Sequence, residues 1–358
     1  MQKFDWYIIK KFFGTFFFTL SLILIIVIIF DISEKIDDFL EHELSIKYII
    51  TKYYFNFIPF FGNLFSPLFI FISVIFFTSK MANNSEIIAI LNSGMSFKRL
   101  LRPFIISAIT LAILSFILGN FIIPSANSKR INFENKYLKN KSYSSEKNIH
   151  LQILPGQYIY MQNFNSKRNI GYKFTLENFK DGALIAKLRA DYIQFDTINQ
   201  KWQINNYEIR EFLDDKELIS KGRKLDTILN LHPREFTKRI SLVETMNIFE
   251  LDNYITEEEL KGSEQLIYHK IEKQKRNAFP FASIILTLIA VSIASKKQRG
   301  GIGFHLGIGI LIAFTYLLFM QVSTTFATNS NLNPALAVWI PNFCYILLAG
   351  ILVYRSAK

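Results

Sequence analysis

Residues of the types that most often do chemistry are few in this 358-residue chain, and they form no catalytic pattern. A P-loop, an HExxH, a CxxC and a GxSxG pattern are all absent from the sequence. The single cysteine, Cys344, allows no disulfide within one copy. The five histidines lack metal-ligand spacing; they are His42, His150, His232, His269 and His305. We therefore expect no catalytic residue, no metal site and no cofactor, so any energy for work comes from another protein.

A glycine-rich run opens the fifth apolar stretch and superficially suggests a phosphate loop. It lacks the Lys-Ser/Thr pair that such a loop needs, so the sequence favours helix packing through small residues. We expect His305, at the same end, to face the helix bundle or the membrane interface. The glycines are Gly300, Gly301, Gly303, Gly307 and Gly309.

The apolar residues are clustered in a way that indicates six membrane-spanning helices. Mean hydropathy is +0.22 although 20% of residues are charged, and this excludes a disordered chain. Each stretch is long enough to cross, or nearly cross, a hydrocarbon layer of about 30 Å. Lys3, Lys10 and Lys11 precede the first stretch as in a signal peptide, but it lacks a small-residue cleavage site, so we expect a helix. The stretches are Phe12 to Phe30, Phe55 to Thr78, Pro103 to Ile123, Ala278 to Ala294, Ile302 to Val322 and Pro334 to Tyr354.

The basic residues of the short connections predict the orientation of these helices. Twelve lie in the terminal segments and in the connections after the second and fourth stretches, whereas the opposite short connections hold only Lys35, Lys47 and Lys52. Because basic residues stay on the cytoplasmic side, both termini are expected to be cytoplasmic and residues 124–277 to be external.

Residues 124–245 have the alternation of a β domain inserted between the third and fourth spans. Leu184, Leu188 and Tyr192 fall on one face of a predicted strand, with charged residues on the other. Similar runs at 157–164, 172–179 and 201–212 predict a sheet sandwich or jelly roll. The segment 246–277 becomes helical in pattern, with a capping-box spacing at Thr256 and Glu259. The expected divisions are 1–123, 124–245, 246–277 and 278–358.

The connection at 80–102 contains a short apolar segment that is too brief to span a membrane. Ser85 could cap a helix that carries Glu86, Ile87, Ile88, Ile90 and Leu91, and Gly94 would end it. Such a helix either lies on the inner leaflet or docks a cytoplasmic partner through its acidic residue.

These features together resemble the lipopolysaccharide-export permeases of the LptF/LptG family. The resemblance covers nearly the whole chain: six spans, a β domain after the third, and the run Ser-Glu-Ile-Ile-Ala-Ile-Leu-Asn-Ser-Gly-Met-Ser at 85–96. Ile123-Pro124, the segment Leu154-Pro-Gly-Gln-Tyr-Ile-Tyr160 and the segment 190–196 with Lys201-Trp202 are also similar.

The resemblance implies an α-helical membrane protein with an inserted periplasmic jelly-roll-like domain, in the inner membrane of a Gram-negative bacterium. It implies a non-catalytic permease subunit that passes lipopolysaccharide from the outer leaflet towards the outer membrane. The implied partners are a cytoplasmic ATPase dimer (LptB-like), a second permease subunit, and periplasmic bridge proteins (LptC/LptA-like). ATP would bind to the ATPase.

The resemblance also implies residue roles. Ser85, Glu86, Ile87, Ile90, Leu91 and Gly94 would contact the ATPase. Lys35, with Lys47 and Lys52, would contact lipid phosphates, although Glu34 or Asp38 could instead pair with Lys35. Tyr160, Leu184, Leu188 and Tyr192 would line an acyl-chain path, or else fill a closed core.

Two other interpretations remain at this point. A membrane-anchored receptor would use the β domain to sense a ligand and the 80–102 loop to signal inwards. An intramembrane enzyme would need acidic or histidine pairs within the spans, where only His305 is found. The sequence leaves open whether the chain is F-like or G-like, whether it pairs with itself, and which glycolipid it handles.

Overall fold

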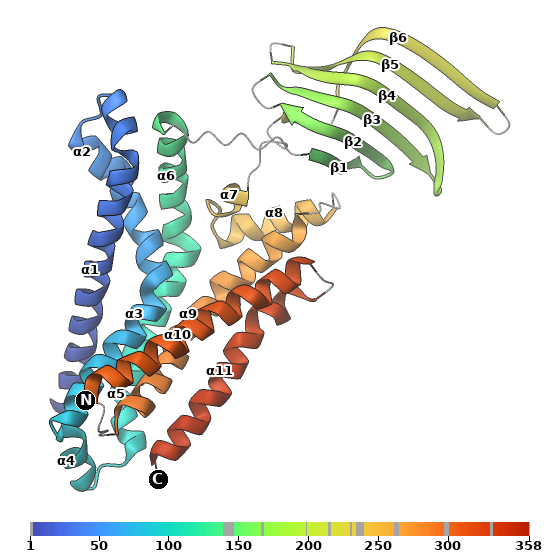
Figure 1. Cartoon of the computed structure of the whole chain (residues 1–358). Helices are drawn as coiled ribbons and strands as arrows, with labels where there is room; N and C mark the ends of the chain where they lie inside the picture. Colours follow the sequence, from blue (N-terminus) through green and yellow to red (C-terminus); the bar gives the residue numbers. More distant parts are fainter. Residues whose placement is uncertain are drawn as a thin grey trace. The chain divides into compact units, whose positions relative to one another are not determined.

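The computed structural model (Figure 1) describes residues 3–138, 147–165, 168–197, 199–213, 216–229, 231–233, 240–260, 265–296, 301–329 and 332–357. The chain forms two compact units. The helical unit contains residues 1–140, 244–248 and 270–358, and the β unit contains 141–243 and 249–269.

Six long apolar helical segments confirm the helical membrane fold that the sequence predicts. The first is α1 (Lys3–Glu41), and the second joins α2 (Ile46–Ile49), the π-helical η1 (Ile50–Tyr54) and α3 (Phe55–Asn83). The third joins α5 (Phe97–Ile117), the π-helical η2 (Leu118–Ile122) and α6 (Ile123–Tyr137). The last three are α9 (Leu266–Ala294), α10 (Gly301–Asn329) and α11 (Pro334–Ala357). The short helix α4 (Glu86–Asn92) lies between the second and third segments.

The third segment is longer than the apolar pattern predicts. The expected boundary between Ile123 and Pro124 falls inside a continuous helix, and the β unit begins only after residue 140. Pro124 directly follows the π-helical turn, in which the Ile123 N–H already bonds the carbonyl oxygen of Leu118 instead of that of Gly119, so the residue without an N–H stands where the regular i→i−4 ladder is interrupted.

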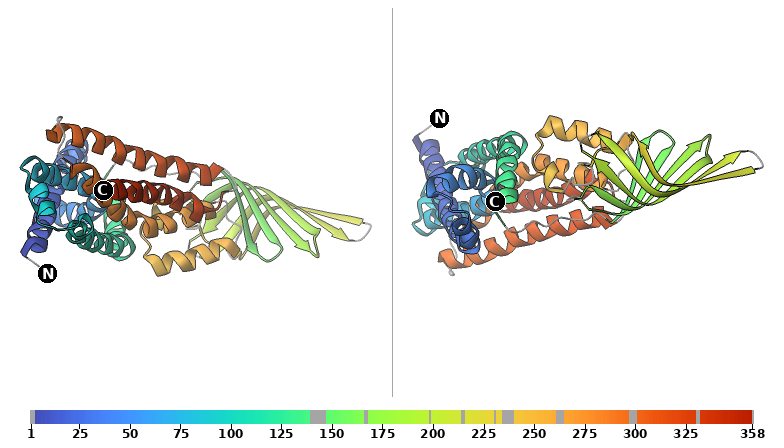
Figure 2. Two further views of the ribbon diagram at one scale, coloured as in Figure 1. Left: turned by 90° about the horizontal axis from the view of Figure 1, so that it is seen from below. Right: turned by 90° about the horizontal axis from the view of Figure 1, so that it is seen from above.

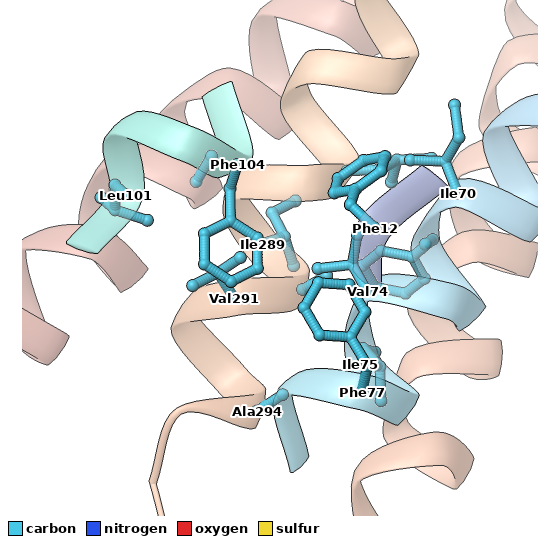
Figure 3. Close-up of a cluster of buried hydrophobic side chains, with 14 of the residues drawn as sticks. Phe12, Ile70, Val74, Ile75, Phe77, Leu101, Phe104, Ile289, Val291 and Ala294 are labelled. Atoms are coloured by element: carbon cyan, nitrogen blue, oxygen red, sulfur yellow. The ribbon is translucent and has the colours of Figure 1, made fainter. Parts of the chain in front are cut away.

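The core of the helical unit is a cluster of buried side chains from α1, α3, α5 and α9. Figure 3 shows Phe12, Val74, Phe104 and Ile289 converging from these helices, and all are at most 1% exposed. The rings of Phe77 and Phe104 stack with centroids 5.5 Å apart. Because lipid is as apolar as these side chains, packing rather than exclusion from water holds such a bundle together.

Helices α3 and α10 pack closely through a glycine. A Cβ atom on Gly309 would collide with Cδ1 of Ile75 and lie 3.4 Å from Cε1 of Phe71, whereas Gly303 and Gly307 have nothing within 4 Å. One turn beyond Ile75 on α3, the Ser79 hydroxyl lies 2.7 Å from Nδ1 of the buried His305. The expected packing role therefore applies to Gly309, His305 faces the bundle, and Gly300 lies outside the described residues.

The β unit contains one six-stranded antiparallel sheet, which Figure 2 shows as a twisted layer. The strands follow chain order, each paired with the next: β1 (Lys147–Leu154), β2 (Gln157–Asn165), β3 (Ile170–Lys180), β4 (Ala183–Asp196), β5 (Lys201–Leu213) and β6 (Lys216–Thr227). The inserted antiparallel β domain is thus confirmed, and within the described residues its strands form a single-layered meander. Asp181 and Gly182 form the tight turn between β3 and β4, both with positive φ.

A crease crosses the sheet and shifts the inside–outside alternation of its strands. Lys173 and Asn206 have positive φ, and no pair is formed at the position between Phe174–Ala190 and Tyr172–Tyr192. Such residues turn the strand locally. On either side of the crease, the residues of the buried face are therefore three apart instead of two, as at Met161 and Phe164, Ala190 and Ile193, and Ile204 and Tyr207.

The segment after the sheet is helical, as expected, but it begins differently. It contains α7 (Ile240–Val243) and α8 (Ile248–Leu260), and α9 then runs without a break into the fourth span. Thr256 lies inside α8, where its hydroxyl donates to the carbonyl oxygen of Asp252. The capping-box prediction for Thr256 is therefore wrong, because the helix already starts at Ile248, about two turns earlier.

Candidate functional site

The short apolar helix in the 80–102 connection is present as α4. Glu86 is its first residue, and Gly94, with φ of +89°, donates its N–H to the carbonyl oxygen of Leu91 at 3.1 Å and stops the helix. Ser85 precedes the helix in a left-handed conformation, and its side chain makes no capping hydrogen bond. Its backbone carbonyl accepts from Ala89 instead. The helix is thus placed as expected, whereas the expected side-chain cap is not formed.

One face of α4 is packed on the bundle and the other is open. Ile87 is 2% exposed and belongs to the core cluster of the helical unit, and Ile90 and Leu91 pack against the same cluster. Ile88 points outwards and is 42% exposed. An isolated helix of seven residues would be only marginally stable, so this packing fixes α4 in place. Helix α4 therefore presents an apolar face in a fixed position, at the end of the bundle where both chain termini lie (Figure 1).

The start of α1 holds both ends of this connection. The Tyr7 hydroxyl donates to Oε2 of Glu86 at 3.1 Å. The Arg99 guanidinium donates to both carboxylate oxygens of Asp5, at 2.6 and 2.8 Å. This bidentate pair is the strong geometry for arginine and a carboxylate, and Asp5 is only 5% exposed. A displacement of α4 would therefore be transmitted directly to α1.

Lys35 lies near the other end of α1 within a cluster of polar side chains. Its ammonium group donates to Oδ1 of Asp31 at 2.5 Å and to the Tyr53 hydroxyl, and it lies 4.9 Å from the centroid of the Tyr53 ring. Tyr54 donates to the other carboxylate oxygen of Asp31 at 3.0 Å. The hydroxyl of Tyr53, which is fully buried, also approaches Glu134 at 3.5 Å. The partner of Lys35 is therefore Asp31, rather than Glu34 or Asp38.

Lys35 keeps some capacity for a further ligand. An ammonium group has three donors, and Asp31 and Tyr53 use two of them. The side chain is about one-fifth exposed. Lys47 and Lys52 are exposed, and neither forms an ion pair with any residue in the described ranges. The structure thus shows one lysine that is held in place and two that are open to solvent or to lipid head groups.

The two faces of the sheet separate the expected lipid-path residues. Leu188 belongs to the buried apolar cluster of the sheet, together with Ile193 and Trp202, whose indole N–H donates to the carbonyl oxygen of Leu231 at 2.8 Å. Leu184 alternates in phase with Leu188 on β4 and is half-buried at the edge of this face, outside the cluster. Tyr192 is half-buried outside the cluster because the crease places Ile193 on the apolar face where strict alternation predicts Tyr192. Tyr160 lies between the buried residues Ile159 and Met161 and so points to the opposite face.

The opposite face is polar. It carries a trough of about 730 Å³ that is lined by Tyr160, Lys187, Arg189 and Glu208, among others. Lys221 and Arg210 donate to Glu208 at 2.9 and 2.8 Å, and these two cations hold the pKa of that carboxyl below its usual range. The charges of this face are thus largely paired with one another. Of the four expected residues, Leu188 belongs to the apolar cluster, Leu184 lies on the same face outside it, and Tyr160 lies on the polar face.

No group of three or more His, Cys, Asp or Glu side chains that could hold a metal ion occurs among the described residues. The structure instead adds polar residues that the sequence analysis missed. Asp31 has the i, i+4 spacing to Lys35 that favours an ion pair, so this pair was detectable. The pair of Asp5 with Arg99 joins residues 94 positions apart, and no local pattern indicates it.

Six spanning helices, an inserted antiparallel sheet and a short apolar helix at one end of the bundle define a polytopic membrane protein with a β insertion. A family model described as "Lipopolysaccharide export system permease LptF/LptG" matches residues 6–355. The chain therefore belongs to the LptF/LptG family of lipopolysaccharide export permeases. A comparison with curated proteins found no match.

Proposed function

We propose that this chain is the transmembrane subunit of an ATP-driven transporter that takes lipopolysaccharide from the outer leaflet of the inner membrane. A separate cytoplasmic ATPase dimer supplies the energy, and a second permease subunit completes the cavity. The β unit lies in the periplasm and passes the glycolipid to a bridge of similar domains. The chain itself carries out no chemical step. Family membership supports the export role, and the basic residues near the termini support the orientation.

The observation that carries the ATPase coupling is the packing of α4. Its inner face, at Ile87, is anchored in the bundle core, and its outer face, at Ile88, is exposed. A helix on the inner leaflet would also expose apolar residues, but it would not need a carboxylate at its first turn beside a phenol of α1. The carboxylate oxygens of Glu86 accept from Tyr7 at 3.1 Å and from Asn84 at 3.3 Å, and each oxygen has a second lone pair with which it can meet a basic group of a partner, in the helix-in-groove mode of recognition.

Charge reversal at Glu86 tests the coupling. We expect Glu86→Lys to abolish ATPase co-purification and transport, because a cation would replace the acid that faces the partner. Tyr7→Phe is the matched control, since it removes only the hydrogen bond between Tyr7 and Glu86 within this chain. If Glu86→Lys retains the ATPase, or if Tyr7→Phe loses it equally, the docking role of Glu86 is wrong.

Lys35 is proposed to contact a lipid phosphate through its remaining donor. A hydrogen bond to a charged group contributes about 1.5–3 kcal/mol, so Lys35→Ala should weaken glycolipid binding by roughly 10- to 150-fold. Lys35→Ala also leaves Asp31 without its cation, and Asp31→Asn with Lys35→Ala removes both charges as a control. Binding of glycolipid to the reconstituted complex measures the effect. Recovery of binding in the double variant would show that Lys35 serves only to neutralise Asp31.

The receptor hypothesis makes a different prediction for the partner of α4. A permease should co-purify with an ATPase whose turnover glycolipid stimulates, whereas a receptor should recruit a kinase or another regulator. Purification of the chain from its native membrane, followed by mass spectrometry of the accompanying proteins and lipids, distinguishes the two. Recovery of a regulator without an ATPase would contradict the transport function.

A further inference from the structure

A cavity of about 440 Å³ lies inside the helical unit, separate from both Lys35 and α4. Its walls come from α3, α5, η2, α6, α9 and α10, and from Glu244. Its volume is within the range of about 300–1,000 Å³ that is usual for small-ligand sites. This volume can hold a lipid head group and the first part of its chains, but not a complete lipid.

The lining of this cavity changes from charged to apolar along α9. Glu272, Lys275 and Arg276 line one end, and Phe279 lies seven residues beyond Glu272, or about 10 Å along the helix axis. Leu317 and Met320 of α10 continue the apolar part. The charged end lies where α9 enters its apolar stretch, at the level of the membrane interface. An amphiphile with a charged head and an apolar tail has the same polarity profile.

Two of the charges in the cavity are already satisfied within the chain. Nε of Arg276 donates to Glu272 at 3.0 Å, and its Nη1 donates to the carbonyl oxygen of Met246 at 2.6 Å. Glu244 and Lys275 are different: neither side chain forms a hydrogen bond or an ion pair with any residue that the structure describes, including each other. Among the described residues that line the cavity, Glu244 and Lys275 are thus a carboxyl and an ammonium group that a ligand can contact.

A buried amide oxygen provides a second, independent indication of a ligand. Asn127 is 1% exposed, and its Oδ1 has no hydrogen-bond partner among the described atoms, although a buried acceptor without a donor is costly. Its Nδ2 donates to the backbone carbonyl of Glu244 at 3.4 Å, so the amide lies next to the Glu244 backbone. The π-helical turn η2 contributes Gly119 to the wall, and such turns occur frequently at functional sites.

The free groups differ in the ligand atoms that they can accept. The Glu244 carboxylate and Asn127 Oδ1 are acceptors, and a primary ammonium with its three N–H donors can serve both. Lys275 is a donor that a phosphate oxygen can satisfy. Burial and the carboxylates of Glu272 and Glu134 raise the pKa of Glu244, while Arg130 and Arg276 oppose this rise. A bound ammonium would favour the ionised carboxylate.

We propose that this cavity binds the phosphoethanolamine head group of a membrane lipid, with the ammonium at Glu244 and Asn127 and the phosphate at Lys275. The quaternary ammonium of a choline lipid has no N–H to donate, and a glycerol head group has no cation. Neither of these lipids should bind well. This site is a property of the helical unit and does not require that the proposed transport function be correct.

Lipid retention tests the proposal on the full chain within its native complex. The protein is reconstituted in nanodiscs that contain equal amounts of phosphatidylethanolamine, phosphatidylcholine and phosphatidylglycerol, and native mass spectrometry identifies the lipids retained after stepwise delipidation. We expect the ethanolamine lipid to be retained roughly tenfold over each of the others, as for one charge-assisted hydrogen bond. Equal retention of the three lipids by the unaltered protein would overturn the proposal, and this measurement needs no variant.

Substitutions then assign the two ends of the head group. Glu244→Gln should abolish the preference for the ethanolamine lipid over the glycerol lipid. Lys275→Gln should instead reduce the retention of the ethanolamine lipid and of the glycerol lipid, because it removes the group that contacts the phosphate. Glu257→Gln and Lys201→Gln make the same changes of charge at exposed positions outside the cavity and should behave as the unaltered protein. If both cavity variants retain the ethanolamine lipid as before, the assignment is wrong.

A competition step identifies the source of the head group. Lipopolysaccharide with and without phosphoethanolamine substituents is added to nanodiscs that contain phosphatidylethanolamine. Displacement by the substituted form alone supports the same head-group chemistry on a glycolipid, and no displacement by either supports a phospholipid. Displacement by both forms equally would contradict recognition of the ammonium. Because no ATP hydrolysis is involved, these outcomes are independent of any transport assay.

Discussion

The contact between α3 and α10 at Gly309 can be tested by adding a single methyl group. In Gly309→Ala the new Cβ atom would overlap Cδ1 of Ile75 and lie 3.4 Å from Cε1 of Phe71. Ile75 and Phe71 are both fully buried, so neither can move away into open space. Because the clash is with the terminal methyl group of Ile75, either that group must shift within the packed core or the two helices must separate.

The cost of this substitution follows from its two opposing effects. Overpacking of a closely packed core costs about 1–3 kcal/mol. Alanine in a helix interior is favoured over glycine by roughly 0.5–1 kcal/mol, which partly offsets that cost. Gly307→Ala has the same benefit without the clash, because nothing lies within 4 Å of its Cβ position. The two variants should therefore differ by about 1–3 kcal/mol, or roughly 5- to 150-fold in the unfolding equilibrium.

Reversible unfolding of the purified protein in mixed micelles measures this difference. We expect Gly309→Ala to be less stable than Gly307→Ala, and Gly307→Ala to equal or exceed the unaltered protein. Direct comparison of the two variants cancels the effect of helix propensity and isolates the α3–α10 contact. Equal stabilities for the two variants would refute the close approach of these helices at Gly309.

Three further predictions concern the remaining polar and apolar features. Asp5→Asn should replace the bidentate ion pair with Arg99 by a weaker contact with a neutral amide. Amide hydrogen exchange in residues 84–96 should therefore accelerate. Unchanged exchange would show that this ion pair does not hold the 80–102 connection. A photocrosslinker at Leu188 should capture lipid during transport and one at Tyr160 should not, because the two side chains lie on opposite faces of the sheet; equal capture would contradict this arrangement. The pKa of Glu244 is raised in the folded protein. The free energy of unfolding should therefore fall as the pH rises from about 4.5, the usual pKa of this carboxyl, through its raised pKa. Glu244→Gln should flatten this fall in unfolding titrations without amine-bearing lipid, and an unchanged slope would exclude Glu244 as its source.

The spans and the central strands could be predicted because their pattern is local. Uncharged apolar stretches indicated all six helices, and alternation indicated β2 to β5. Strand β6 was missed because its first six residues, Lys216 to Lys221, are all exposed. This half of the strand therefore has no buried face that would produce an alternation. The end of the third helix was missed because α6 is mostly polar, and its apolar contacts, such as those of Phe133 with Phe39 and Tyr53, join positions far apart in the chain.

The site residues were only partly predictable for a related reason. The helix α4 follows from a local run of apolar residues, but the attachment of Glu86 to Tyr7 joins positions 79 apart in the chain. The crease in the sheet arises from single residues with positive φ on neighbouring strands, and it moves Tyr192 off the apolar face. Alternation within one strand cannot reveal a change that neighbouring strands make together.

Helix α1 physically links the two sites on which the proposed function depends. Its first turns hold the α4 connection through Asp5 and Tyr7, and Asp31 and Lys35 lie about 39 Å further along the same helix. In its most apolar window only 11% of the residues are buried within the chain, against 67% for α9. Most of that window faces away from the rest of the chain, whereas Ile8, Phe12 and Phe16 nearer the start of α1 are buried in the bundle core. If an ATPase acts on α4 as proposed, a displacement there would reach the Lys35 cluster through the continuous helix α1, and it would also have to change the contacts of Phe12 with the bundle core.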